Sequence, residues 1–168
     1  MGSHFLPLSL LAAFVVAFLP STAASYNLYP VRWADNCFTH DPGLTESLAE
    51  LGQYADIDDC GNGAEITLAY DANLKSTGRA LLTADANGTM IRCEITLHTS
   101  ADSRTKLHEL GHCLGLDHSD DEQALMYRFY RPDLTADDIS GLLELYGPPR
   151  GVERLTGAYR VVLMEIGR

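Results

Sequence analysis

Basic residues are scarce in this chain of 168 residues, which has 12 Lys and Arg against 23 Asp and Glu and a formal net charge of -11. Nucleic acids and anionic membrane surfaces attract proteins through clustered positive charge. The composition therefore argues against nucleic acid as a partner, and against membrane binding once any leader has been removed. With 46% hydrophobic residues, the chain can still bury the core of one domain.

The apolar run at residues 5–19 is too short to be a comfortable membrane span, which takes about 20 residues, and Pro20 follows it. The small residues after Pro20 offer signal peptidase a site after Ala23 or Ala24. We therefore expect a signal peptide over residues 1–24 and a secreted protein, extracellular or periplasmic. No Lys or Arg precedes the run, so an uncleaved anchor remains the alternative.

The stretch from His108 to His118 carries the clearest chemistry. Residues four apart lie on one face of a helix, so His108 and His112 direct their imidazoles to a common point, with Glu109 beside them. Gly115 can end this helix because glycine enters the left-handed conformation at little cost, and the reversed chain can return His118 to that point. Three neutral imidazoles with an open fourth position are typical of a catalytic zinc site.

A zinc ion held in this way lowers the pKa of its bound water to about 7. Glu109 is placed to take the proton as the water attacks a carbonyl, and it can later protonate the leaving amine. A histidine pair on a helix face is more often structural. The full set of three His, one Glu and one Gly at these positions favours one catalytic zinc ion.

These residues have the form H-E-x-x-H-x-x-G-x-x-H and so resemble the metzincin metallopeptidases. Residues 124–127, 134–141 and 145–147 are similar to the matrixin, or matrix-metalloproteinase-like, branch. This resemblance implies an α+β metzincin fold, with a twisted, mostly parallel sheet, an antiparallel edge strand, two long helices and a small C-terminal subdomain with one helix. It also implies a monomeric zinc metalloendopeptidase acting on proteins or peptides, with its catalytic domain over residues 25–148 and a tail of unassigned role over 149–168.

The resemblance extends to residues around the zinc. Met126 corresponds to the Met-turn, whose thioether lies beneath the zinc ligands as an apolar floor. Arg128, Phe129 and Tyr130 fall where matrixins carry Pro-x-Tyr, the wall of the pocket for the residue after the cleaved bond, and Arg128 replaces the proline. In metzincins an antiparallel edge strand pairs with extended substrate. The candidate residues here are Arg79, Ala80, Leu81 and Leu82, although an ordinary outer strand is the alternative.

Apolar periodicity predicts the other elements. We expect strands at residues 31–34, 66–70, 79–83 and 90–97. We expect helices at residues 45–56, at 103–114, and from about 136 to a stop at 147–149. Asn87-Gly88 is a strong hairpin signal, so the strands on either side of it should be antiparallel neighbours. We expect Tyr54 on the apolar face of the first helix and Ile91 on the core face of the last strand.

Four cysteines in an exported chain most simply form two disulfides, of three possible pairings. The strand at 90–97 and the helix running back at 103–114 would bring Cys113 to about the level of Cys93. A Cys93–Cys113 bond is therefore feasible, and Cys37–Cys60 follows by exclusion.

A calcium site is possible but unsupported. Asp56, Asp58 and Asp59 lie together in an expected loop, but the spaced ligand pattern of a calcium loop is absent, and solvated carboxylates are the default interpretation. Matrixin catalytic domains typically carry a second, structural zinc as well. The segment between Tyr70 and Arg79 has no histidine for it, so we expect one zinc.

Two other functions are compatible with a zinc site. A degenerate peptidase could bind zinc without catalysis, but it would not need Glu109. A zinc amidase or deacylase could use the same chemistry on non-protein amides, although the apparent edge strand favours peptides.

Overall fold

The computed structural model describes residues 24–129, 133–150, 152–155 and 158–161, the last two as backbone strands. Nearly all of the expected signal peptide, and Tyr130, lie outside these ranges. Within them, no helix has the length and hydrophobicity needed to cross a membrane. The elements are β1 Asn27–Leu28, β2 Cys37–His40, the 3-10 helix η1 Pro42–Leu44, α1 Thr45–Gly52, β3 Asp58–Asn62, β4 Ile66–Tyr70, β5 Gly78–Ala84, β6 Met90–Leu97, α2 Ser103–Cys113, β7 Leu116–Asp117, α3 Ala136–Tyr146, β8 Val152–Leu155 and β9 Ala158–Val161.

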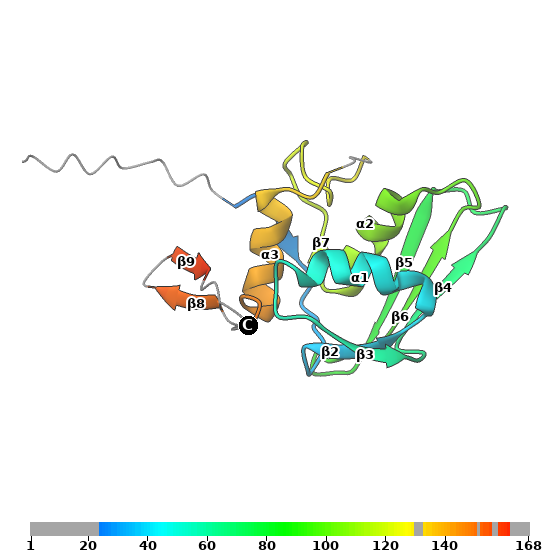
Figure 1. Cartoon of the computed structure of the whole chain (residues 1–168). Coiled ribbons are helices and arrows are strands. Elements are labelled where there is room, and N and C mark those ends of the chain that lie inside the picture. Colours follow the sequence, from blue (N-terminus) through cyan, green and yellow to red (C-terminus); the bar gives the residue numbers. More distant parts are fainter. Residues whose placement is uncertain (1–23, 130–132, 151, 156–157, 162–168) are drawn as a thin grey trace, which may run out of the picture.

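A five-stranded sheet in the order β3-β2-β4-β6-β5 forms the centre of the fold (Figure 1). β2 is parallel to β3 and β4, and β4 is parallel to β6, whereas β5 is antiparallel to β6 and forms one edge. Both α1 and α2 contribute to one core with the strands, through side chains such as Leu48, Leu110 and Ile95. The predicted mostly parallel sheet with an antiparallel edge strand is confirmed, as is the α+β class.

The β5–β6 hairpin forms around the predicted turn, where Gly88 has a φ of +82°. A bulge interrupts the pairing, because Thr83 pairs with Arg92 while Ala84 pairs with Met90, leaving Ile91 as an extra residue. Ile91 is therefore 56% exposed and Met90 is buried. The expected core position of Ile91 was wrong because the alternation shifts at the bulge.

Three other local expectations were wrong. Residues 31–34 form no strand beyond a single bridge between Arg32 and Thr89, because the buried Trp33 packs against the end of α2 instead. The first helix stops at Gly52, so Tyr54 is 38% exposed rather than in the core. The acidic segment expected as a loop contains the second edge strand, β3.

The C-terminal end of α2 is fixed by side chains from two distant segments. Trp33 donates its Nε1–H to the carbonyl of Cys113 at 2.8 Å, and the Tyr146 hydroxyl donates to the carbonyl of Leu114 at 2.6 Å. Both carbonyls belong to the last turn of a helix, where backbone acceptors have no partner within the helix. These bonds hold the turn that follows the second histidine of the motif.

The tail beyond α3 forms a two-stranded hairpin of its own. β8 pairs antiparallel with β9, and neither strand joins the five-stranded sheet. The tail therefore adds no strand to the predicted domain, within the described residues.

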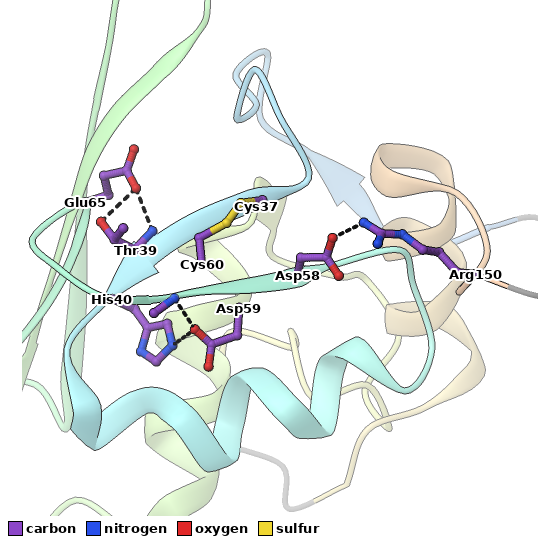
Figure 2. Close-up of a disulfide and its surroundings, with 9 residues drawn as sticks. Cys37, Thr39, His40, Asp58, Asp59, Cys60, Glu65 and Arg150 are labelled. Atoms are coloured by element: carbon purple, nitrogen blue, oxygen red, sulfur yellow. Dashed lines mark hydrogen bonds and ion pairs between the residues drawn. A yellow bond between two sulfur atoms is a disulfide. The ribbon is translucent and has the colours of Figure 1, made fainter.

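Two disulfides, Cys37–Cys60 and Cys93–Cys113, hold the sheet, and both are pairs expected from the sequence. Figure 2 shows the first joining β2 to the edge strand β3. The second joins β6 to α2, and both of its sulfurs belong to residues with no exposed surface. Cys60, in contrast, is exposed.

This difference in exposure predicts stepwise reduction. A mild reductant should open Cys37–Cys60 first, because the attacking thiolate needs access to the sulfur. Each bond closes a loop of similar length, so its loss should cost about 3 kcal/mol in the free energy of unfolding. Alkylation and mass spectrometry after graded reduction check the order. Simultaneous labelling of all four cysteines would contradict it.

The carboxylates around β3 are paired with side chains rather than gathered as a cation site (Figure 2). Asp59 Oδ1 lies 2.9 Å from Nε2 of the buried His40, and Arg150 forms salt bridges with Asp56 and Asp58. Just before β4, the Glu65 carboxylate accepts hydrogen bonds from the backbone and hydroxyl of Thr39 on β2. The Asp58 and Asp59 contacts attach the edge strand β3 to Arg150 and to β2, whereas Glu65 links β2 to the start of β4.

Candidate active site

Three histidines from two segments converge beside the sheet. His108 and His112 lie one turn apart on α2, and His118 follows β7 after the chain reverses at Gly115, whose φ is +99°. Their candidate ligand atoms all lie within 4.8 Å of one another. Among the described residues this is the one group of three or more side chains able to hold a metal ion.

Hydrogen bonds fix the orientation of two of these rings. His108 Nδ1 lies 2.7 Å from the carbonyl oxygen of Leu125, and His112 Nδ1 lies 2.8 Å from that of Leu116. A carbonyl oxygen can only accept, so each Nδ1 carries the proton and each Nε2 keeps its lone pair. This is the usual arrangement of metal-binding histidines. It leaves Nε2 of both rings available to a metal ion.

The charge state of the cluster also suits a cation. Burial lowers the pKa of His112 to about 4, and it lowers the pKa values of His108 and His118 as well. The imidazoles are therefore neutral at pH 7, as metal binding requires. Three neutral nitrogen donors with room for a fourth ligand fit zinc better than the harder cations calcium and magnesium.

The lowered pKa values predict how zinc affinity depends on pH. Protons compete with zinc only below the pKa of each ligand. Three histidines at the ordinary value near 6.5 would lose roughly 30-fold in affinity between pH 7 and pH 6. Because burial lowers the pKa of all three histidines, we expect a smaller loss over this interval and a further decline at lower pH, measured by competition with a zinc indicator. A 30-fold loss by pH 6 would contradict the buried, neutral site.

Met126, the predicted Met-turn residue, is buried against the histidine helix. Its side chain is 1% exposed, and a Cβ added at Gly111 would fall 2.5 Å from its Sδ. The backbone N–H groups of Leu125 and Met126 both donate to the carboxyl group of Asp138, at 2.9 Å each. The loop that carries Met126 is thus fixed by a residue of α3.

Asp138 is a site residue that the sequence interpretation missed. The sequence placed it in the first turn of the closing helix, and it does form a capping box with Thr135. It is also fully buried and reaches back to the loop that carries Met126. The capping-box spacing was visible in the sequence, but the second contact depends on tertiary folding.

Glu109 is buried between the histidines and the edge strand. Its side chain is 7% exposed, and burial raises its pKa to about 7 while a hydrogen bond from the backbone of Ala80 opposes the shift. A Cβ added at Gly78 would fall 2.5 Å from its Oε1. The carboxyl group therefore rests directly on the β5 backbone, and it is not part of the histidine cluster.

This close contact predicts the effect of Gly78→Ala. The new methyl group would occupy the position of the Glu109 carboxyl, so we expect at least tenfold lower hydrolytic activity with zinc content unchanged. Steady-state kinetics and zinc analysis check the two parts. Thr83→Ala, an exposed change on the same strand, is the matched control and should leave both values unaltered. Loss of zinc in Gly78→Ala would contradict the assignment of the contact to Glu109 alone.

The side chains of the predicted substrate strand alternate between the core and the surface. Ala80 and Leu82 pack against the core, whereas Arg79 and Leu81 are exposed. The outer edge of β5 has no partner strand among the described residues, although the Ala80 N–H already donates to Glu109 and the Gly78 carbonyl already accepts from the Ser76 hydroxyl. The inward side chains serve the core instead of a ligand.

The predicted pocket wall is described only in part. Arg128 lines a small cavity together with His108 and Glu109, whereas Phe129 is 65% exposed and contacts Tyr127. The structure therefore brings Arg128 to the site. It does not bring Phe129 into that cavity.

Tyr29 is a second residue near the histidines that the sequence did not indicate. Its ring centre lies 5.8 Å from that of His112. Burial and the nearby Asp117 carboxylate raise its pKa to about 12, so it is a neutral hydrogen-bonding group at pH 7. An isolated tyrosine far away in the sequence gives no signal for such a contact.

Comparison with known proteins supports the same chemistry. A sequence model described as matrixin matches residues 51–147, more than half of the chain. The chain is 34% identical to stromelysin-1 of Equus caballus over 113 residues, 63% of this chain and 22% of that protein. It is 56% identical to metalloendoproteinase 1-MMP of Arabidopsis thaliana over 46 residues, 24% of this chain and 13% of that protein.

The matched part is thus less than a quarter of the length of either relative. The family match spans the Glu109 helix, all three histidines, Met126 and the closing helix. The chain belongs to the matrixin family.

Proposed function

We propose that this protein is a zinc-dependent endopeptidase, in which His108, His112 and His118 hold one zinc ion and Glu109 acts as general base and acid. One observation carries the proposal. Three imidazoles converge with their Nε2 lone pairs available, and a buried carboxyl group with a pKa near 7 lies between them and an open sheet edge. A site that only bound zinc would not need that carboxyl group.

A bound zinc ion supplies a Lewis acid that polarises the scissile carbonyl and lowers the pKa of water. Glu109 takes the proton from the attacking water and passes it to the leaving amine. A pKa of about 7 lets the same group accept and donate a proton near neutral pH. Contact with the β5 backbone fixes the position of this carboxyl group relative to substrate bound on that edge.

Substrate binding in this proposal uses the open edge of β5. An extended peptide would add a strand beside Arg79 to Leu82 through backbone hydrogen bonds, which carry little side-chain specificity. Specificity would then come from the cavity that Arg128 lines. The unpaired edge and the position of Arg128 support this arrangement.

We further propose that the protein is secreted. Two disulfides are characteristic of chains that fold in oxidising compartments, and the apolar run at residues 5–19 suits a signal peptide. Expression in a secreting host, with N-terminal sequencing of the released chain, tests export and cleavage together. A chain that stays with the membrane fraction would favour the uncleaved anchor.

The activity is tested on the purified chain with unfolded casein as a generic substrate. We expect one zinc per chain, loss of cleavage when a chelator removes it, and return of cleavage with added zinc. Zinc binding without casein cleavage would favour a noncatalytic domain. Release of acetate from an N-acetylated sugar, with casein intact, would favour the amidase alternative.

A further inference from the structure

The cavity beside Glu109 is small. Its volume is about 140 Å³, and its walls include Ser76, Thr77, Thr105 and Arg128 as well as His108 and Glu109. At about 30 Å³ for each water molecule, this space is comparable to one side chain of the size of Glu or Leu. Size alone therefore does not distinguish an acidic from an aliphatic occupant.

The chemistry of the walls does distinguish them. None of the described residues that line this cavity has a hydrocarbon side chain. An aliphatic occupant would remove water from hydroxyl groups and a guanidinium without replacing its hydrogen bonds, which costs free energy. The cavity is therefore unfavourable for a leucine-like side chain.

Arg128 is the one cation in this lining. No carboxylate among the described residues forms a salt bridge with it, so its guanidinium is not neutralised within this part of the chain. The other charged wall, Glu109, is held against β5 by the backbone of Ala80, whereas Arg128 enters from the loop after Met126. Among the described residues, Arg128 is therefore the cavity's one cationic partner for a carboxylate.

We propose that Arg128 makes this cavity select an acidic side chain, glutamate or aspartate, at the peptide position after the cleaved bond. The inference rests on the proposed endopeptidase function, since it assigns that position to this cavity. The planar guanidinium binds a carboxylate through two parallel hydrogen bonds, which an amide or an aliphatic group does not reproduce. The charge of Arg128 thereby sets specificity.

The test uses the zinc-loaded protein and a set of peptides that differ only at this position, with Glu, Asp, Gln, Leu or Lys. Mass spectrometry of the products identifies the bond cleaved. We expect kcat/KM for the Glu peptide to exceed that for the Leu peptide about tenfold, as one charge-assisted interaction at a partly exposed site allows. The preference should shrink in 1 M NaCl, because salt screens the guanidinium.

Three variants separate specificity from folding. Arg128→Leu should abolish the preference for Glu over Leu, and Arg128→Lys should keep part of it. Arg92→Leu is the matched control, because Arg92 lies on β6 away from the cavity and pairs with Glu94. An equal loss on all peptides in Arg128→Leu, or a preference for Leu in the parent protein, would overturn the inference. No cleavage of any peptide or of casein by the zinc-loaded parent would instead refute the endopeptidase function.

Discussion

Replacing Glu109 with alanine is expected to lower kcat/KM for peptide hydrolysis by about 10²- to 10⁴-fold, the usual contribution of a general acid-base group. Zinc content should stay at one ion per chain, because the proposed ligands are histidines. Parallel zinc analysis and kinetics of parent and variant make the measurement. Glu46→Ala, an exposed change on α1, is the control and should retain activity.

If the Glu109 variant lost zinc as well, the carboxyl group would be a ligand or a support for one, and the proposed mechanism would fail. If parent and variant cleaved the peptide at equal rates, a group other than Glu109 would accept the proton of the attacking water. If parent and variant both bound zinc and neither cleaved the peptide, the result would favour the noncatalytic alternative.

The raised pKa of Glu109 adds a stability test to the kinetic one. The folded protein holds the carboxyl group at a pKa of about 7, above the usual value near 4.5 in an unfolded chain. This group therefore lowers folding stability as pH rises from about 4.5 to 7, by about 3 kcal/mol in total for the metal-free protein. Metal-free Glu109→Gln should be more stable than the parent at pH 8 and similar to it at pH 4.

Removing the Asp138 side chain is expected to lower the free energy of unfolding more than the other single substitutions proposed above. The fully buried carboxyl group accepts four hydrogen bonds, from the backbone of Leu125 and Met126 and from the backbone and hydroxyl of Thr135. Asp138→Ala leaves these donors without a partner. We expect a loss of about 3 kcal/mol or more, and a melting temperature lower by about 10 °C.

Asp120→Ala provides the matched control for Asp138, because Asp120 is exposed in the nearby loop. Its unfolding free energy should change by less than about 0.5 kcal/mol. Because the lost bonds fix the loop of Met126, the Asp138 variant should also bind zinc more weakly at temperatures where it remains folded. A variant as stable as the control would show that water replaces the carboxyl group at little cost.

Features encoded within a few residues were predictable from the sequence. Helical spacing placed His108 and His112 on one face, Gly115 marked the end of their helix, and Asn87-Gly88 marked the hairpin. Each depends on backbone preferences or periodicity that act locally. The mostly parallel sheet with one antiparallel edge strand came instead from resemblance to a family.

Features that depend on distant partners were not predictable in the same way. Trp33 lies in an apolar segment that looks like a strand, yet its indole bonds to the end of α2. Asp138 looks like an ordinary capping residue, and its second role appears only when α3 packs beside the loop of Met126. The bulge at Ile91 likewise arises from the register of two strands.

The unpaired edge of β5 could promote aggregation as well as bind a substrate. A free strand edge offers its backbone groups to any extended chain, so it can template aggregation of the protein with itself or with unfolded neighbours. Two features limit this: Arg79 places a charge on the edge strand, and the bulge opposite Thr83 and Ala84 increases the local twist. Resistance to aggregation at high concentration therefore depends in part on the same edge that would receive a peptide in the proposed function.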